Sequence, residues 1–230
     1  MPAVRYVPVM DRKLALVIGA SGGIGSALAA ALDADHTVTR LSRSRDGMDV
    51  TDESSVCAAL DALEGPYDLI FVATGALSIG GNGPEKSLKS VGLDGLSSQF
   101  AVNAVGPMLV LKHGLRLLPR DRRSVFAALS ARVGSIGDNK TGGWYGYRAS
   151  KAALNQLIHG AAVEVARTHP KAILALLHPG TVDTEFTRNH PGRDKLSPSD
   201  SATRLISVLD GLVADQSGGF FDYSGDRVPW

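Results

Sequence analysis

Several features of membrane-bound and secreted proteins are missing from this sequence. Its 230 residues include one cysteine, Cys57, so an intrachain disulfide is excluded and an intracellular protein is favoured. No apolar run approaches the roughly 18 residues that cross a bilayer. Residues 1–13 also lack the apolar core of a secretory signal. We therefore expect a cytoplasmic protein that makes no contact with a membrane.

The sequence also lacks a charge imbalance and a spacing of histidines that is typical of metal sites. A formal net charge of +1 gives no electrostatic basis for a nucleic-acid partner. The six histidines are scattered and show no His-x-x-x-His or similar pattern, so no metal site is expected. What remains is an ordinary globular composition, in a chain long enough to bury a core without metals or disulfides.

Apolar runs and helical segments alternate along the chain. Buried strands are predicted over 14–18, 36–41, 68–73, 124–129, 171–177 and 220–223. Helices are predicted over 27–32, 52–63, 93–118, 144–168 and 201–213. This alternation is typical of an α/β fold, a single Rossmann-type, doubly wound parallel sheet of about seven strands with helices on both faces. Because no composition shift marks a boundary, residues 1–230 are predicted to form a single domain, with 1–12 as an N-terminal extension.

A glycine-rich loop follows the first predicted strand and opens the first helix. Glycines let the backbone come close to a ligand, and the amides at a helix start suit an anionic pyrophosphate. In this context the loop predicts dinucleotide binding, and a plain structural turn is the alternative. The predicted contacts are Gly19, Ser21, Gly22, Gly23, Ile24 and Gly25.

Tyr147 and Lys151 are four residues apart on a predicted helix, so they lie on one face, one turn apart. A free phenol has a pKa of about 10 and is a poor acid–base catalyst at neutral pH. A nearby ammonium and an oxidised nicotinamide ring would lower that pKa. The pair therefore predicts proton transfer to a carbonyl oxygen as hydride arrives, or from an alcohol. Without the glycine loop, the same spacing would indicate only a half-buried stripe.

From about Lys13 onward, the chain resembles the short-chain dehydrogenase/reductase family, and within it the C-factor-like and sniffer-like carbonyl reductase branch. The resemblance is carried by the spacing of the glycine loop and by the segments Val102-Asn103-Ala104-Val105-Gly106-Pro107 and Tyr147-Arg148-Ala149-Ser150-Lys151-Ala152-Ala153-Leu154-Asn155. It implies reversible hydride transfer from the nicotinamide C4, with Tyr147 as the acid–base and Lys151 bound to the ribose and the tyrosine. It also implies that Asn103 holds a water in a proton relay, and a helix-bending polar group is the alternative.

Two segments depart from the family pattern. Where the family has Ser-Ser-x-x-Gly, this chain has Ser130-Ala131-Arg132-Val133-Gly134, so an alanine replaces the serine that orients the substrate carbonyl. Ser135 is the first candidate for the missing hydroxyl and Ser130, which is also a predicted cofactor contact, is the second. The absence of any such serine is the third possibility. In the other segment, Ala73, Thr74 and Gly75 stand where the family has Asn-Ala-Gly beside the adenine ribose, and all three are predicted cofactor contacts.

The end of the second strand bears on the choice between NADP and NAD. Proteins that prefer NAD normally place an acid there to bind the ribose 2′-hydroxyl, and this chain has none before Asp46. Ser42 and Arg43 are predicted to bind a 2′-phosphate instead, which favours NADP (NADPH) over NAD. A solvated arginine is the alternative. Asp49 and Val50 resemble the family's adenine-binding pair, with helix capping as the competing role of Asp49.

A segment after the strand at 171–177 resembles the part of the family fold that surrounds the nicotinamide carboxamide. Its predicted contacts are Pro179, Gly180, Val182 and Thr184, while Thr181 is a candidate for a turn cap. The substrate pocket is predicted between 76–83, 131–143 and a lid over 184–196. Trp144 and Phe186 are either its apolar walls or core residues. Basic lid side chains fit an anionic substrate or a solvated loop, and they are Arg188, His190, Arg193 and Lys195.

The combined features predict an NADP-dependent short-chain oxidoreductase that acts on a small carbonyl or alcohol. The alternative is a nucleotide-binding signalling or regulatory protein with weak or no turnover, which Ala131 and the C-factor-like resemblance suggest. A fatty-acid-type oxoacyl reductase is a third hypothesis, and the unusual insert at 131–143 speaks against it. The family resemblance implies a homodimer or homotetramer formed through the helices at 93–118 and 144–168.

Overall fold

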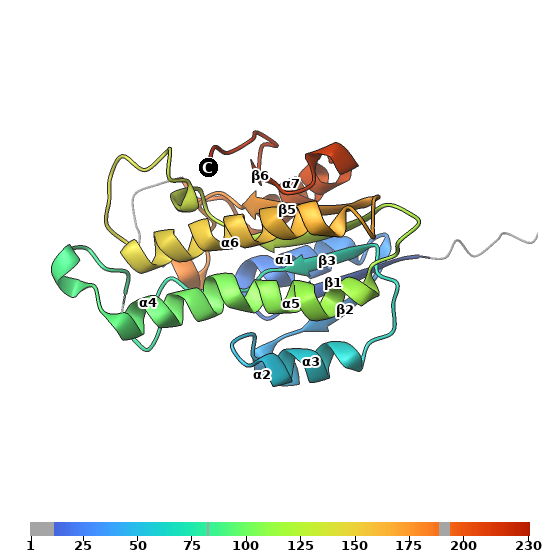
Figure 1. Cartoon of the computed structure of the whole chain (residues 1–230), viewed down its shortest axis with the longest axis horizontal. Helices are drawn as coiled ribbons and strands as arrows, with labels where there is room; N and C mark the ends of the chain where they lie inside the picture. The colour runs from blue at the N-terminus through green and yellow to red at the C-terminus, as the bar shows by residue number, and fades with distance from the viewer. Residues whose placement is uncertain (1–11, 82, 189–193) are drawn as a thin grey trace, which may run out of the picture.

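Six parallel strands form one sheet at the centre of the molecule (Figure 1). The computed structural model describes residues 12–81, 83–188 and 194–230. In these ranges the strands are β1 (Lys13–Ile18), β2 (His36–Leu41), β3 (Leu69–Val72), β4 (Ser124–Leu129), β5 (Ala172–His178) and β6 (Gly219–Asp222), arranged in the order β2-β1-β3-β4-β5-β6. The sequence therefore predicts each of these strands to within two residues, and the doubly wound parallel sheet is confirmed.

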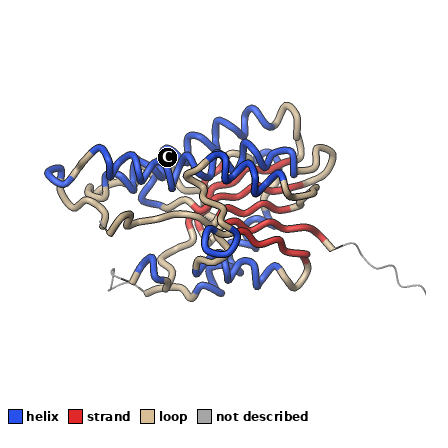
Figure 2. The backbone as a smooth tube through the Cα atoms, turned by 90° about the horizontal axis from the view of Figure 1, so that it is seen from below, coloured by secondary structure: helices blue, strands red, loops and turns tan. Residues whose placement is uncertain are grey.

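Helices cover both faces of the sheet, so that the strands lie between two helical layers (Figure 2). On one face, α1 (Gly23–Leu32) packs against α7 (Pro198–Gly211). On the other face lie α3 (Glu53–Asp61), α4 (Leu93–Phe100), α5 (Gly106–Gly114) and α6 (Tyr145–Val165). In Figure 1, α5 and α6 run side by side across the front of the sheet.

Alternating side chains of each strand feed two separate cores, because successive residues of a strand point to opposite faces. In β4, Val125 and Ala127 join the core beneath α1 and α7, whereas Phe126 and Ala128 join the core beneath α5 and α6. Both sets are buried, which explains why the strands read as continuous apolar runs.

The direction of the strand order reverses beside β1. The chain passes from β1 to β2 on one side and later to β3 on the other, and all strands are parallel. In open α/β sheets, ligands bind at the carboxyl ends of the strands at such a point. The glycine loop leaves β1 at this edge, and the loop that begins at Ala73 leaves β3 beside it.

Besides shifted ends, such as the start of α1 at Gly23 in place of residue 27, two features of the helices differ from the sequence prediction. A short helix, α2 (Arg43–Asp46), follows β2 and was not predicted, because four residues are too few to show a helical period. The single helix predicted over 93–118 is interrupted by η2 (Ala101–Val105), one π-helical turn that carries Asn103. Such turns are frequent at functional sites.

Part of the predicted N-terminal extension (residues 1–11) and part of the predicted lid (residues 189–193, with His190 and Arg193) lie outside the described residues. Within the described ranges, no helix is both long enough and apolar enough to cross a membrane. The same ranges contain no group of three or more His, Cys, Asp or Glu side chains placed to hold a metal ion.

Candidate active site

The glycine loop makes a tight turn between β1 and α1. Gly19 has a φ of +85°, and its N–H donates to O of Leu41 at 2.9 Å, so the loop is tied to the end of β2. A Cβ at Gly25 would lie 2.2 Å from O of Gly19, so only glycine lets α1 begin this close to the loop. Gly22 and Gly23 are exposed at the start of α1, where the first N–H groups have no partner inside the helix. The N–H of Gly22 already donates to O of Gly19 at 3.0 Å, so the amides at the start of α1 that stay open to an anion begin at Gly23.

Two distant segments lie against this loop. A Cβ at Gly19 would come within 2.9–3.0 Å of the backbone of Ala73 and Thr74. A Cβ at Gly23 would lie 2.5 Å from Cγ2 of Thr184, the residue that precedes η5 (Glu185–Thr187). The fold thus brings three of the predicted cofactor-binding segments together. Oγ1 of Thr74 is buried without a hydrogen-bond partner among the described residues, so its polar group is available to a ligand.

Tyr147 and Lys151 lie one turn apart on the buried face of α6. Nζ of Lys151 is 6.0 Å from the centroid of the Tyr147 ring and donates to O of Leu129 at 2.8 Å. Burial raises the pKa of Tyr147 and lowers the pKa of Lys151 to about 7, because desolvation disfavours both charged forms. Burial alone therefore raises the pKa of the phenol. The spacing predicts the opposite, a lowered pKa, when a charged lysine and an oxidised nicotinamide ring lie beside it.

Asn103 is buried in η2 and is held from two sides. Its Oδ1 accepts the N–H of Ala76 at 2.9 Å, and its Nδ2 donates to O of Ala76 at 2.9 Å and to Oε1 of Gln99 at 2.6 Å. A Cβ at Gly75 would lie 3.2 Å from Oδ1 of Asn103 and 3.4 Å from Nζ of Lys151. Gly75 thus lies between the amide oxygen and the ammonium. Since a carbonyl oxygen has two lone pairs, Oδ1 keeps one for a further donor.

The alanine that replaces the family's serine lies against the candidate catalytic tyrosine. Ala131, Leu77 and Tyr147 form one small buried apolar cluster. Ser130 is buried and its hydroxyl donates to Oδ1 of Asn155 at 2.6 Å, which uses its single proton inside the fold. Oγ of Ser135 accepts the N–H of Asp138 at 3.1 Å, which leaves the Ser135 proton for another acceptor. The role of Ser135 stays a prediction.

The segment after β2 brings the carboxylate of Asp46 to the end of the strand, although Asp46 lies several residues beyond that end in the sequence. Helix α2 folds Asp46 back, so that its Oδ2 accepts the N–H of Ser42 at 2.8 Å and the Ser42 hydroxyl at 3.2 Å. Arg43 has a side chain that is 79% exposed, and its Nη1 lies 3.9 Å from Oδ2 of Asp49. A ligand at Ser42 would therefore meet a carboxylate as well as the guanidinium.

Asp49 does not cap the helix that follows it. Its Oδ1 accepts the N–H and the hydroxyl of Thr51, whereas Asp52 caps α3 through the N–H of Ser54. The hydrogen bonds from Thr51 lower the pKa of Asp49. Val50 packs against η2 and α5, because a Cβ at Gly106 would lie 2.9 Å from its side chain. Oδ2 of Asp49 remains as the acceptor for the predicted adenine contact.

The Pro179–Thr184 segment is bonded at both ends. O of Pro179 accepts the Ser201 hydroxyl at 2.9 Å, and Gly180 has a φ of +82°. Val182 is buried and pairs with Leu196 in an isolated bridge. A residue just before the predicted lid therefore lies beside the last residue of that lid. The Thr181 and Thr184 side chains are not equivalent, since Thr184 lies at the glycine loop and Thr181 lines a neighbouring cavity.

Aromatic rings surround the phenol. The Tyr147 ring lies 6.3 Å from the Trp144 ring and 6.0 Å from the Phe186 ring, between centroids. Both predicted wall residues therefore contact the candidate catalytic tyrosine. Nearby, a cavity of about 440 Å³ is lined by polar side chains that include Arg132 and His178. Burial lowers the pKa of His178 to about 4, so this side chain is neutral at pH 7.

The roles of two residues of this site, Gln99 and Asp46, were missed by the sequence analysis. Gln99 bonds Asn103 and also donates to O of Leu77, but an isolated glutamine in a helix carries no recognisable signal. Asp46 was seen but not connected to Ser42, because α2 was not predicted.

The chain is similar to known proteins over most of its length. A family model described as enoyl-(acyl carrier protein) reductase matches residues 24–207. The chain is 34% identical over 174 residues to the C-signal of Myxococcus xanthus, a match that covers 75% of this chain and 98% of that protein. It is 31% identical over 188 residues to the 1-hydroxy-2-glutathionyl-2-methyl-3-butene dehydrogenase of Rhodococcus sp. (strain AD45), covering 80% and 79%.

Solved structures share the fold over nearly the whole chain. A short-chain dehydrogenase/reductase of Burkholderia multivorans, solved with bound NADP, superposes with a TM-score of 0.77 at 27% identity and covers 95% of this chain and 100% of its own. The carbonyl reductase Sniffer of D. melanogaster has a TM-score of 0.78 at 20% identity with the same coverage, and this likeness concerns the fold alone.

Proposed function

This chain belongs to the short-chain dehydrogenase/reductase family, and we propose that it transfers hydride reversibly between NADP(H) and a small carbonyl or alcohol. The observation that carries the proposal is the convergence of Tyr147, Lys151 and Asn103 beside Gly75, at the edge of the sheet that also presents the glycine loop. A protein that only binds a nucleotide has no use for a buried phenol and amine at that place.

The residues present fit a nicotinamide dinucleotide. The amides of Gly23 and Ile24 would hold its diphosphate, with Gly22 in the turn beside them, and the orphaned hydroxyl of Thr74 fits a ribose beside Gly75. The adenine would contact Asp49 and Val50. The remaining predicted contacts, at the glycine loop and the nicotinamide, are Gly19, Ser21, Gly25, Ala73, Ser130, Pro179, Gly180, Val182 and Thr184.

When bound, the cofactor supplies or accepts the hydride; the protein supplies the proton. Because burial raises its pKa, Tyr147 stays protonated at neutral pH and can donate to the carbonyl oxygen. Lys151, held by O of Leu129, returns a proton toward the phenolate, and its pKa of about 7 suits both giving and taking it. The free lone pair of Asn103 Oδ1 would hold a water that connects Lys151 to solvent. Ser135 is the proposed donor that orients the carbonyl.

The preference for NADP over NAD rests on Arg43. Its exposed guanidinium, 3.9 Å from Asp49, can turn toward a 2′-phosphate without losing a close hydrogen bond. Asp46 opposes this preference, because its carboxylate occupies the N–H and hydroxyl of Ser42. The Burkholderia multivorans relative was solved with NADP, which supports the same choice.

The direct test is NADPH oxidation with a panel of aldehydes, ketones and quinones. Turnover should appear with at least one class of substrate and fall at least about a thousandfold in Tyr147→Phe, which removes the proton donor. NADPH binding, followed by its fluorescence, should stay within about threefold, since the phenol is not needed for nucleotide affinity. Turnover that survives in Tyr147→Phe would rule out this chemistry.

A signalling or regulatory protein with weak turnover is the second candidate. It is supported by the similarity to C-signal over 98% of that protein and by Ala131 in the place of the family's serine. Tight NADPH binding without turnover across the panel would favour it over the enzyme.

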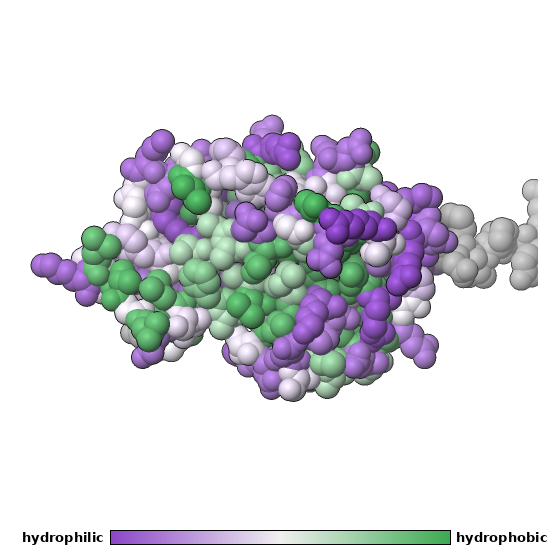
Figure 3. Space-filling view, viewed as in Figure 1, coloured by the Kyte–Doolittle hydropathy of each residue, from purple (hydrophilic) through white to green (hydrophobic). Residues whose placement is uncertain are grey.

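We further propose a homodimer or homotetramer formed through α4, α5 and α6. Apolar side chains are exposed on these helices and their connecting turn, at Leu93, Val105, Leu157 and Val163. Figure 3 shows hydrophobic surface across this face of the molecule. Light scattering should give an assembled mass for the wild type and a smaller one for Val163→Glu; a monomeric wild type would refute this assembly.

A further inference from the structure

Helix α6 carries Tyr147 in its first turn but has no cap of its own. The residue before the helix is Trp144, whose indole has a donor and no acceptor for an amide. Trp144 and the two residues before it, Gly142 and Gly143, all have positive φ values of 54–66°. The first turn of the helix also contains no acidic residue. A residue outside the helix is therefore needed to accept hydrogen bonds from the amides at the start of α6.

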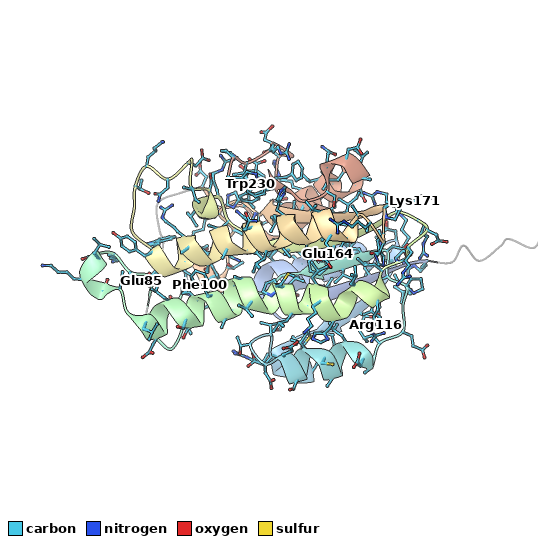
Figure 4. The ribbon with its side chains drawn as sticks, in the orientation of Figure 1. Glu85, Phe100, Arg116, Glu164, Lys171 and Trp230 are labelled. Atoms are coloured by element: carbon cyan, nitrogen blue, oxygen red, sulfur yellow. The ribbon has the colours of Figure 1, made fainter. Side chains whose placement is uncertain are left out.

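That partner is Glu85, about sixty residues earlier in the chain and in the loop that follows β3. Its backbone O accepts the N–H of Trp144 at 2.6 Å, and its Oε2 accepts the N–H of Gly146 at 3.1 Å. Figure 4 shows Glu85 at the N-terminal end of α6. One residue thus satisfies two of the amides that the helix start leaves open.

The fit between Glu85 and α6 is close. A Cβ at Gly146 would lie 2.8 Å from Oε1 of Glu85 and 3.2 Å from Cγ of Gln99. A side chain at this position would push the Glu85 carboxylate away from the helix. Gln99, a residue of α4, accepts a hydrogen bond from Asn103. The loop that carries Glu85, α4 and α6 therefore meet at this point. Tyr147 follows Gly146 directly, and its ring is placed by this turn.

We propose that Glu85 is a positioning residue for Tyr147, which holds the first turn of α6 through its carboxylate and carbonyl and so aims the phenol at the reacting atoms. The proposal rests on the proposed oxidoreductase function. A carboxylate at a helix start also offsets the positive end of the helix dipole, which otherwise favours the phenolate. We therefore expect the charge of Glu85 to disfavour the phenolate, in addition to the part its contacts play in orienting the phenol.

Other charged groups lie on the elements packed around this turn, and they are Arg148 and Lys151 of α6, Asp94 of α4, Arg132 beside Ala131 and Glu185 of η5. Arg132 is bonded to Asp222 and Glu185 pairs with Arg188. Each of these residues is unchanged in the Glu85 variants, so a difference between Glu85→Ala and Glu85→Gln reports on the Glu85 side chain.

The test compares Glu85→Ala, Glu85→Gln and the matched control Asp94→Asn, which removes one negative charge at the exposed start of α4. Glu85→Ala should lower kcat about ten- to a hundredfold, because a catalytic group displaced by about 1 Å loses that much. Its KM for the carbonyl and its Kd for NADPH should change less than about threefold. Glu85→Gln keeps an acceptor oxygen and should restore kcat to within about threefold of the wild type.

The pH profile separates positioning from general stability. Glu85→Gln should shift the phenol titration to lower pH, because the offsetting charge is gone, while Asp94→Asn should not. An unchanged kcat in Glu85→Ala, or a Glu85→Gln variant as slow as Glu85→Ala, would overturn the proposal. So would a loss of kcat that merely follows the folded fraction in a thermal melt.

The two proposals fail in different ways. If the wild type turns over no substrate, the oxidoreductase assignment fails, and the positioning role is then read from the ¹³Cζ NMR signal of Tyr147, assigned with Tyr147→Phe. Glu85→Ala should shift that signal and Asp94→Asn should leave it unchanged. A Tyr147 signal that is the same in Glu85→Ala and in the wild type would refute the positioning role, whatever the enzyme does.

Discussion

Replacing Lys151 by methionine should make the stability of the protein much less dependent on pH. Lys151 is 2% exposed, and burial lowers its pKa to about 7 from 10.5. Between these values the unfolded chain binds a proton that the folded protein does not, so the free energy of unfolding rises with pH over this window. Below about pH 7 the folded protein must hold a buried ammonium, and the free energy of unfolding is then lowered by the full cost of burying that charge.

The magnitude follows from the difference between the two pKa values. At pH 6 the penalty approaches the full difference, about 4–5 kcal/mol, and at pH 9 it falls to about 2 kcal/mol. The wild type should therefore gain roughly 2–3 kcal/mol between pH 6 and pH 9 relative to Lys151→Met. The methionine variant should also be the more stable protein at pH 6, since its side chain fills the same space without a charge.

Urea unfolding at pH 6, 7.5 and 9, without nucleotide, measures these differences. Lys89→Met is the matched control, because Lys89 is exposed and its charge is solvated in both states. If the wild type and Lys151→Met show the same change in unfolding free energy from pH 6 to pH 9, Lys151 does not titrate near neutrality and the proton-transfer role proposed for it is wrong.

Three further substitutions test other parts of the site. Ala131→Ser should raise kcat/KM about tenfold, because it adds a hydroxyl beside the phenol that is worth about 1–3 kcal/mol; a decrease in steady-state kcat/KM would show that the carbonyl lies elsewhere. Arg43→Ala should weaken NADPH binding by about tenfold or more and leave NADH nearly unchanged, whereas Asp46→Asn should strengthen NADPH; equal effects of Arg43→Ala on the two titrations would remove the 2′-phosphate assignment. Gly25→Ala should destabilise the protein by about 1–3 kcal/mol or more in urea unfolding, because its Cβ would lie 2.2 Å from O of Gly19; an unchanged midpoint would contradict the tight turn.

The sequence predicts the sheet well because its strands are buried on both faces. Val125 to Leu129 reads as an unbroken apolar run, and such a run between turn signals leaves few alternatives. The glycine loop and the Tyr147–Lys151 pair are local patterns, so they could be found from short stretches of the chain.

Contacts between distant segments could not be predicted in the same way. Neither the bond from Glu85 to Gly146 nor the bond from Gln99 to Asn103 has a periodic or compositional signal, because each depends on how a loop or helix is placed in space. Asp46 reaches Ser42 only because a four-residue helix turns the chain back, and the pKa of Lys151 depends on burial that no local pattern reports.

The segment that begins at Thr184 touches both halves of the site. Thr184 rests on the glycine loop at Gly23, and two residues later the Phe186 ring meets the Tyr147 ring. One short stretch of backbone therefore lies against both the glycine loop and the phenol. A substitution here that changes the wall beside the phenol should also change the contact with the loop that we propose to hold the diphosphate, so substrate choice and nucleotide affinity should change together.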